Sequence, residues 1–160
     1  VWEMAWPRRP ERSGIAGRWV NNFGLTLIGQ GLAHALQTVT LLVAAWVAQS
    51  GGAGLFEQGR VGWFTALLVT AFCFEFVGYA LHVAMHEVPL LWRFHAVHHS
   101  DTDLDVFSTY RHHPGEQIFV SLFSVPIVLA LAPPASVLLA VQATRMAVNI
   151  FSHANIHVTE

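Results

Sequence analysis

The chain has 160 residues, enough for one domain at most, and its composition is unlike that of a soluble domain: 54% of its residues are hydrophobic and only 11% are charged. Its formal net charge of −2, with histidine neutral, gives no reason to propose a nucleic-acid partner. The single cysteine, Cys73, excludes an internal disulfide and CxxC chemistry.

Two long segments contain no Asp, Glu, Lys or Arg at all, namely 19–56 and 117–144. A soluble domain needs charged groups on each exposed face, so uncharged segments of this length indicate burial in lipid. The mean hydropathy of +0.47 agrees with this interpretation. The sequence therefore predicts an all-α, polytopic integral membrane protein.

The chain begins with a basic lead-in, residues 1–20, that contains four of its eight arginines. Asn22 is placed to cap a first membrane helix at 23–49. At about 1.5 Å per residue this helix would be long enough to cross a bilayer. The glycine-rich segment 50–54 ends it. A second membrane helix is predicted at 61–87, just before Pro89.

A polar, histidine-rich segment follows at 88–116, and residues 117–152 predict a helical hairpin with Pro133 and Pro134 at its tip. The positive-inside rule places the arginine-rich lead-in in the cytoplasm. Successive crossings then bring every clustered histidine to the cytoplasmic face. We therefore expect a bacterial inner-membrane protein with its histidine cluster on the cytoplasmic side.

Ten histidines are far more than average usage predicts for this length, and seven of them fall between positions 82 and 113. Residues three or four apart on a helix share one face, with Cβ atoms about 5–6 Å apart, so they can bind one metal ion together. Imidazole suits Fe, Zn, Cu and Ni. The clustered histidines are His82 and His86; His95, His98 and His99; His112 and His113; and His153 and His157.

Each histidine group also has an ordinary structural interpretation. His34, alone in an apolar helix, is typical of packing, and His112 with His113 would by themselves be typical of a solvated loop. A single H-x-x-x-H arises by chance. The combination of H-x-x-x-H with a nearby H-x-x-H-H, both beside a membrane helix, favours a metal site. Copper or zinc trafficking and haem ligation are alternatives for the same residues.

The segments LHVAMHEVPLLWRFHAVHHSDTDLDVFSTYRHHPGE and NIFSHANIH resemble the bacterial sterol desaturase branch of the fatty acid hydroxylase superfamily, and the resemblance covers nearly the whole chain. It implies an all-histidine site that binds two iron ions and activates O2. The implied reaction hydroxylates or desaturates a lipid, sterol or carotenoid-like substrate, with electrons from a donor protein. Zinc could replace iron in such a site. The implied ligands are His82, His86, His95, His98, His99 and His153.

Two further histidines are carried over from the resemblance as ligand candidates. His113 matches the family's His-Pro, as a ligand or a neighbour of the ligands, and His157 stands where relatives often carry Arg. The family's last H-x-x-H-H is expected beyond His157, so we interpret residues 1–160 as a single, C-terminally incomplete domain. The alternative is a non-catalytic membrane subunit that packs against partner proteins in a membrane complex.

Several acidic residues have two interpretations each. Glu75, in the second predicted helix, either orients an imidazole or hydrogen-bonds to another helix. Asp101, Asp103 and Asp105 either form a solvated turn or supply a carboxylate to a ligand histidine. Metal transport is the weakest hypothesis, because only His34 and Glu75 are polar or ionisable enough within the predicted helices to line a path.

Overall fold

The computed structural model describes residues 2–9, 15–25, 27, 31–52, 54–56, 61–101 and 103–157. This part of the chain is helical and confirms the predicted all-α class. The helices are α1 (Trp2–Ala5), α2 (Ile15–Leu25), α3 (Leu32–Ser50), α4 (Trp63–Glu87), α5 (Pro89–His95), the short 3-10 helices η3 (His98–Ser100) and η4 (Val106–Tyr110), α6 (Pro114–Leu131) and α7 (Ala135–His153).

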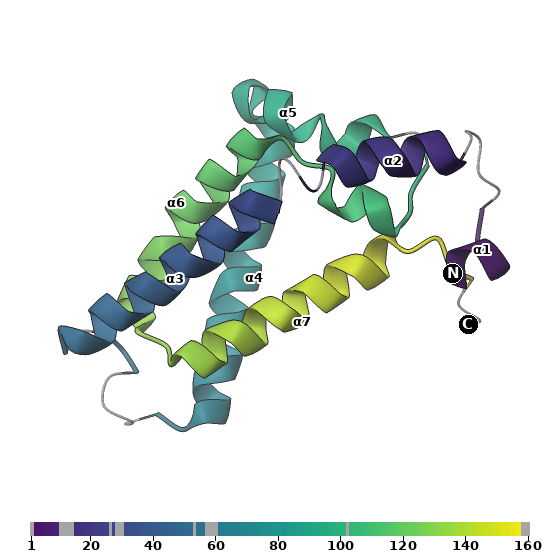
Figure 1. Cartoon of the computed structure of the whole chain (residues 1–160). Helices are drawn as coiled ribbons and strands as arrows, with labels where there is room; N and C mark the ends of the chain where they lie inside the picture. Colours follow the sequence, from purple (N-terminus) through teal and green to yellow (C-terminus); the bar gives the residue numbers. More distant parts are fainter. Residues whose placement is uncertain are drawn as a thin grey trace.

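The helices α3, α4, α6 and α7 pack together as an up-and-down bundle. Figure 1 shows α3 beside α6, with α4 behind them and α7 returning from the far end of the bundle. Their shared core contains Leu41 of α3, Phe74 of α4, Val128 of α6 and Leu138 of α7, all almost fully buried. Close packing of these apolar side chains fixes how the helices lie against one another.

The outer surface of the bundle is also apolar. Phe72, Phe76, Leu122 and Phe151 are among many large hydrophobic side chains that are more than half exposed. An apolar surface of this extent is suited to lipid rather than to water. Within the described residues, α4, α6 and α7 are each long and apolar enough to cross a membrane. The predicted polytopic integral membrane protein is thus confirmed.

The first helix was predicted at 23–49, and its predicted start is wrong. Two helices occupy this region, α2 and α3, and they run in different directions (Figure 1). Asn22 lies inside α2, where it is fully buried and hydrogen-bonded to a distant loop, so it caps nothing. Hydropathy alone cannot detect where one apolar helix ends and the next begins. The apolar part described in α3, Ala35–Ser50, is shorter than a full span.

The second helix and the hairpin lie close to their predicted positions. The second helix is α4, and the hairpin consists of α6 and α7. At its tip, Ala132 takes a left-handed conformation, with φ of 49°, before the two prolines. The amide of Gln49 donates to the carbonyl of Pro133 at 2.7 Å. The backbone N–H of Phe56 donates to Leu131 O at 2.9 Å. These bonds join the α3–α4 connection to the hairpin tip.

The two described ends of the chain meet at the opposite end of the bundle (Figure 1). Pro7 forms an antiparallel bridge with Ile156. One carboxylate oxygen of Glu3 accepts the backbone N–H groups of Asn155, at 2.6 Å, and Val106, at 3.1 Å. The basic lead-in is therefore tied to the segment that leaves α7.

The connection at the hairpin tip gives a test of the fold. Gly54 has a φ of +130°, and a Cβ at this position would overlap the Cβ of Ala132. We expect Gly54→Ala to lower the free energy of unfolding by at least about 2 kcal/mol, because it adds both backbone strain and a clash. Gly62→Ala is the matched control, since its Cβ would meet nothing within 4 Å. Unfolding in detergent measures both variants, and equal stability would contradict the contact between Gly54 and Ala132.

Candidate metal centre

The turn between α4 and α5 brings the first histidines together. Val88 is extended, with φ of −94° and ψ of 115°, and Pro89 occupies the first turn of α5. The chain therefore turns back after α4. The ring of His95 lies with its centroid 4.7 Å from that of His82 and 5.0 Å from that of His86.

Four of the predicted ligands form one compact group, called here the four-histidine group: His82, His86, His95 and His99. One ring nitrogen of each lies within 4.8 Å of those of the others. Within the group, Nε2 of His95 and Nε2 of His99 are 3.2 Å apart. Ligand nitrogens about 2.1 Å from a shared ion lie about 3–4 Å apart, so the group fits a transition-metal ion. His95 is buried and the other three are exposed, which leaves one side of the group open.

A buried carboxylate, that of Glu116, supports this group from α6. Its Oε1 lies 3.2 Å from Nδ1 of His95. When Nδ1–H donates to the carboxylate, Nε2 keeps its lone pair for a metal ion, which is the usual carboxylate–histidine–metal arrangement. The same oxygen lies 3.1 Å from Nδ1 of His112, whose Nε2 donates to the carbonyl of Thr109 at 3.0 Å. One carboxylate oxygen of Glu116 therefore contacts the rings of both His95 and His112.

A second gathering of histidines lies beside the first. The rings of His98 and His112 stack with centroids 4.4 Å apart and an interplanar angle of 1°. His153, at the end of α7, places its Nε2 3.3 Å from Nε2 of His98. Its Nδ1 donates to the carbonyl of Asn149 at 2.9 Å, so its Nε2 carries the lone pair. The end of α7 thus brings the ring nitrogen of His153 next to the histidines of the 88–116 segment.

Burial and neighbouring rings favour the neutral form of His98 and of His99. Burial, followed by the neighbouring rings of His112 and His153, lowers the pKa of His98 to about 3. Partial burial and the rings of His95 and His86 lower the pKa of His99 as well. Because a metal ion binds the neutral imidazole, protons compete weakly at these positions near pH 7.

Nδ1 of His98 and Oε2 of Glu116 are among the buried polar atoms that have no hydrogen-bond partner within the described part of the chain. Buried polar atoms of native proteins are nearly always paired. Both atoms belong to the histidine-rich region. Its donor set therefore fits bound metal ions better than it fits a closed network of hydrogen bonds.

The other two ligand candidates lie outside the four-histidine group. His113 caps α6, where its Nδ1 accepts the backbone N–H of Gly115 at 3.0 Å, and its ring packs on Phe94. His157 is exposed and follows the bridge to the lead-in, where its backbone N–H donates to Trp6 O at 3.3 Å. A metal-binding role for either stays a prediction. The side chain of His34 lies outside the described residues.

Among the described residues, Glu75 contacts another helix, which is the second of its two interpretations, and not a histidine ring. Its Oε1 lies 2.8 Å from Nε of Arg145, so the contact is an ion pair between α4 and α7. The carboxylate beside the histidines is that of Glu116. The sequence interpretation missed both this carboxylate and its contact with His112. The available signal was the position of Glu116 four residues after His112, in the first turn of an apolar helix.

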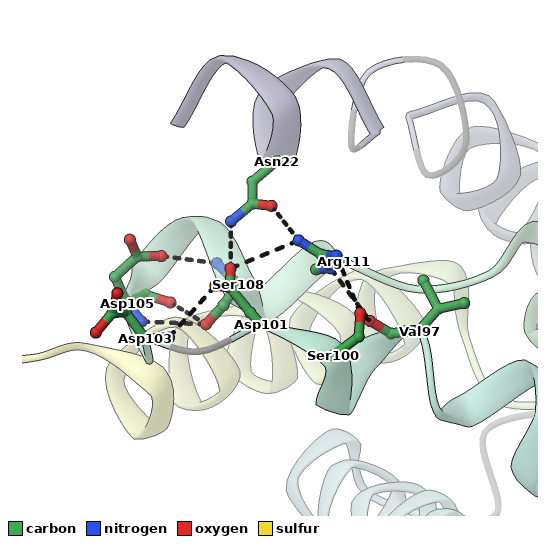
Figure 2. Close-up of polar contacts among 8 residues, drawn as sticks. All are labelled: Asn22, Val97, Ser100, Asp101, Asp103, Asp105, Ser108 and Arg111. Carbon is green, nitrogen blue, oxygen red and sulfur yellow. Dashed lines mark hydrogen bonds and ion pairs between the residues drawn. The ribbon is translucent and has the colours of Figure 1, made fainter. Parts of the chain in front are cut away.

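A polar network, shown in Figure 2, fixes the loop that carries His98 and His99. Asn22 of α2 donates to Asp101 at 2.6 Å and accepts from Nη1 of Arg111 at 2.8 Å. Arg111 also donates through Nε to Val97 O, at 3.2 Å, and through Nη2 to Ser100 Oγ, at 2.9 Å. Because the guanidinium is planar and has five N–H donors, it fixes the turn on both sides of the two histidines.

The aspartates after the H-x-x-H-H form a turn, which is one of their two interpretations, but the turn is not solvated throughout. Asp105 is 1% exposed and caps η4, accepting the N–H of Ser108 at 2.9 Å. Asp103 donates its backbone N–H to Asp101 at 3.3 Å. These contacts shape the loop between the histidine groups (Figure 2).

Comparison with known proteins agrees with this geometry. Residues 67–160, which contain every histidine except His34, match the sequence model of fatty acid hydroxylases. The chain belongs to the fatty acid hydroxylase family. The ornithine lipid hydroxylase OlsE of Rhizobium tropici is 30% identical over 161 residues, which cover 97% of this chain and 46% of the relative. This family member thus spans about half the length of that curated relative. No solved structure matches it significantly.

The network around Asn22 gives a test within this hydroxylase family member. We expect Asn22→Ala to lower the free energy of unfolding by about 1–3 kcal/mol, because it removes the two hydrogen bonds that the fully buried Asn22 side chain makes with Asp101 and Arg111. Asn21→Ala is the matched control, since Asn21 is exposed on the same helix and its loss should change stability by less than about 0.5 kcal/mol. Thermal unfolding in detergent measures both, and equal effects would contradict the network.

Proposed function

We propose that this chain forms the core of a membrane-bound, non-haem di-iron oxygenase that hydroxylates a lipid. The observation that carries this proposal is the four-histidine group, whose ligand nitrogens converge within 4.8 Å at the end of a membrane helix. Family membership and the similarity to a lipid hydroxylase support the same reaction class.

In this proposal the four-histidine group holds one iron ion. The second iron ion is held beside it by His98 and His153, whose Nε2 atoms lie 3.3 Å apart, with His112 stacked on His98. Every ligand is a neutral imidazole, so zinc could occupy the same positions as a substitute.

The reaction needs such a group because an unactivated C–H bond is too strong for acid–base chemistry. The bound iron supplies the activation of O2 that breaks this bond. One oxygen atom enters the C–H bond, and the other leaves as water with two electrons and two protons. Those electrons come from an electron-donor protein.

The chain's own residues position and shield the reacting groups. Glu116 holds the proton on Nδ1 of His95, which fixes the ring's tautomer and orientation. Burial of His95 excludes water from that side, while the exposed rings of His82, His86 and His99 leave the other side open. A cavity of about 140 Å³ borders His82 between the membrane helices, where a lipid carbon could approach from the bilayer.

The orientation in the membrane follows from the arginines. Arg8 and Arg9 are tied through backbone hydrogen bonds to Asn155, just after α7, and Arg111 lies beside the histidines. Under the positive-inside rule these arginines support a cytoplasmic location for this end of the bundle, which we propose lies in a bacterial inner membrane, where a soluble electron donor can reach it.

The test is incorporation of oxygen from labelled O2 into membrane lipids. Cells that express the protein under 18O2 should accumulate lipids that gain one labelled oxygen atom, detected by mass spectrometry. His86→Gln, a change at an exposed member of the group, should reduce this product by at least about tenfold. Glu87→Gln, a change at the exposed neighbour of His86 in α4 that lies outside the group, is the matched control and should retain the labelled product.

Each remaining outcome has a meaning. Label incorporation that survives His86→Gln would contradict the assignment of the metal centre. An intact, folded and metal-loaded protein that gives no labelled lipid would favour a non-catalytic membrane subunit instead.

A further inference from the structure

The cavity beside His82 contains a charged residue that the proposed chemistry does not use. It lies between α4, α6 and α7 and is lined by apolar side chains, among them Leu81, Val120 and Phe123, and by His82 and Glu116 at the metal end. Arg145 of α7 also lines it. A guanidinium in the middle of a membrane helix is costly, and such residues usually serve a function.

The surroundings of Arg145 leave room for its head group at the cavity wall. Gly78 of α4 faces it, and a Cβ on Gly78 would lie only 3.2 Å from Nη2 of Arg145. The guanidinium carbon also lies 5.5 Å from the centroid of the Phe74 ring. Any larger residue at position 78 would crowd the guanidinium, so the glycine permits its close approach to the helix.

The ion pair with Glu75 accounts for only part of this arrangement. Nε of Arg145 lies 2.8 Å from Oε1 of Glu75, whose side chain is 65% exposed on the outside of the bundle, whereas that of Arg145 is 28% exposed. Glu75 is not among the residues that line the cavity. The carboxylate thus lies on the outer side of the guanidinium, while the guanidinium itself borders the cavity.

We propose that Arg145 is the binding residue for an anionic group of the lipid substrate, a carboxylate or a phosphate, inside this cavity. The guanidinium binds such groups through two parallel N–H···O bonds. A cavity of about 140 Å³ holds roughly five water-sized groups of ~30 Å³ each, enough for a small anionic group and a short piece of chain. Binding of the anionic group does not depend on the proposed function, but the position at which the substrate reacts rests on it.

The spacing along α4 predicts which carbon reacts. Gly78, opposite Arg145, precedes His82 by one helical turn, about 6 Å along the axis. A substrate anchored at Arg145 therefore presents a carbon close to its anionic group to the metal centre. Hydroxylation is expected near this group rather than near the methyl end of the chain.

Binding can be tested without turnover. The protein is reconstituted in phosphatidylcholine vesicles with stearic acid carrying a nitroxide near its methyl end, or with the methyl ester of the same probe. Electron paramagnetic resonance gives the fraction of each nitroxide probe that is immobilised on the protein. We expect the wild-type protein to prefer the acid over the ester by about tenfold, within the range of charge-assisted hydrogen bonds.

Two variants separate anion binding from the structural ion pair. Arg145→Gln should remove the preference for the acid. The double variant Glu75→Arg with Arg145→Glu restores the ion pair with reversed charges, so it should recover stability but not the preference. Arg8→Gln, which removes an exposed charge outside the helices, is the control and should keep the preference for the acid over the ester. A wild-type protein without preference, or a double variant that keeps it, would overturn the inference.

Iron content measured on the same samples keeps the two proposals apart. Loss of the preference in Arg145→Gln at wild-type iron content supports the anion site. A preference in wild-type protein that binds no iron would support the anion site while contradicting the di-iron function. A phosphate monoester probe, compared with the carboxylate, decides between the two anionic groups, and binding of neither would overturn the proposal.

Discussion

The carboxylate of Glu116 is buried where the histidine-bearing segments meet, and a buried carboxylate must be neutralised by hydrogen bonds or by positive charge. Here its Oε1 lies 3.2 Å from His95 and 3.1 Å from His112. His95 in turn faces the other members of the four-histidine group, and His112 stacks on His98, which contacts His153 of α7. This one carboxylate therefore links α6 to the histidines from α4, from the 88–116 segment and, through them, from α7.

The same helices need apolar side chains where they face lipid and polar side chains where they form the candidate metal centre. The sides of α4, α6 and α7 are apolar and carry large exposed side chains, whereas their ends at one side of the bundle carry histidines and Glu116. The loops at this end are held by polar contacts such as those between Asn22 and Arg111, because irregular backbone exposed to lipid would leave its polar groups without hydrogen bonds. The far end is closed by short backbone contacts around Ala132.

The sequence predicted the features that follow from local periodicity. The span of α4, the hairpin with its two prolines, and the pairs His82–His86 and His95–His99 all rest on helical spacing or on turn chemistry, which a single sequence displays. It did not predict that α2 and α3 are separate helices, because hydropathy does not show that Asn22 is buried against a loop distant in sequence. Glu116 was missed for the same reason: its partners lie on another element, and hydropathy does not show which polar residue of an apolar helix faces inward.

The most direct test of the central claim is the metal content of protein purified from its native membrane, measured by inductively coupled plasma mass spectrometry together with iron X-ray absorption. Convergence of the histidines predicts about two iron ions per chain with nitrogen-dominated coordination at roughly 2.1 Å. Glu116→Gln, which keeps the shape of the side chain but removes its charge, should reduce that content. Folded wild-type protein that binds no iron, even after loading in the absence of zinc, would contradict the account.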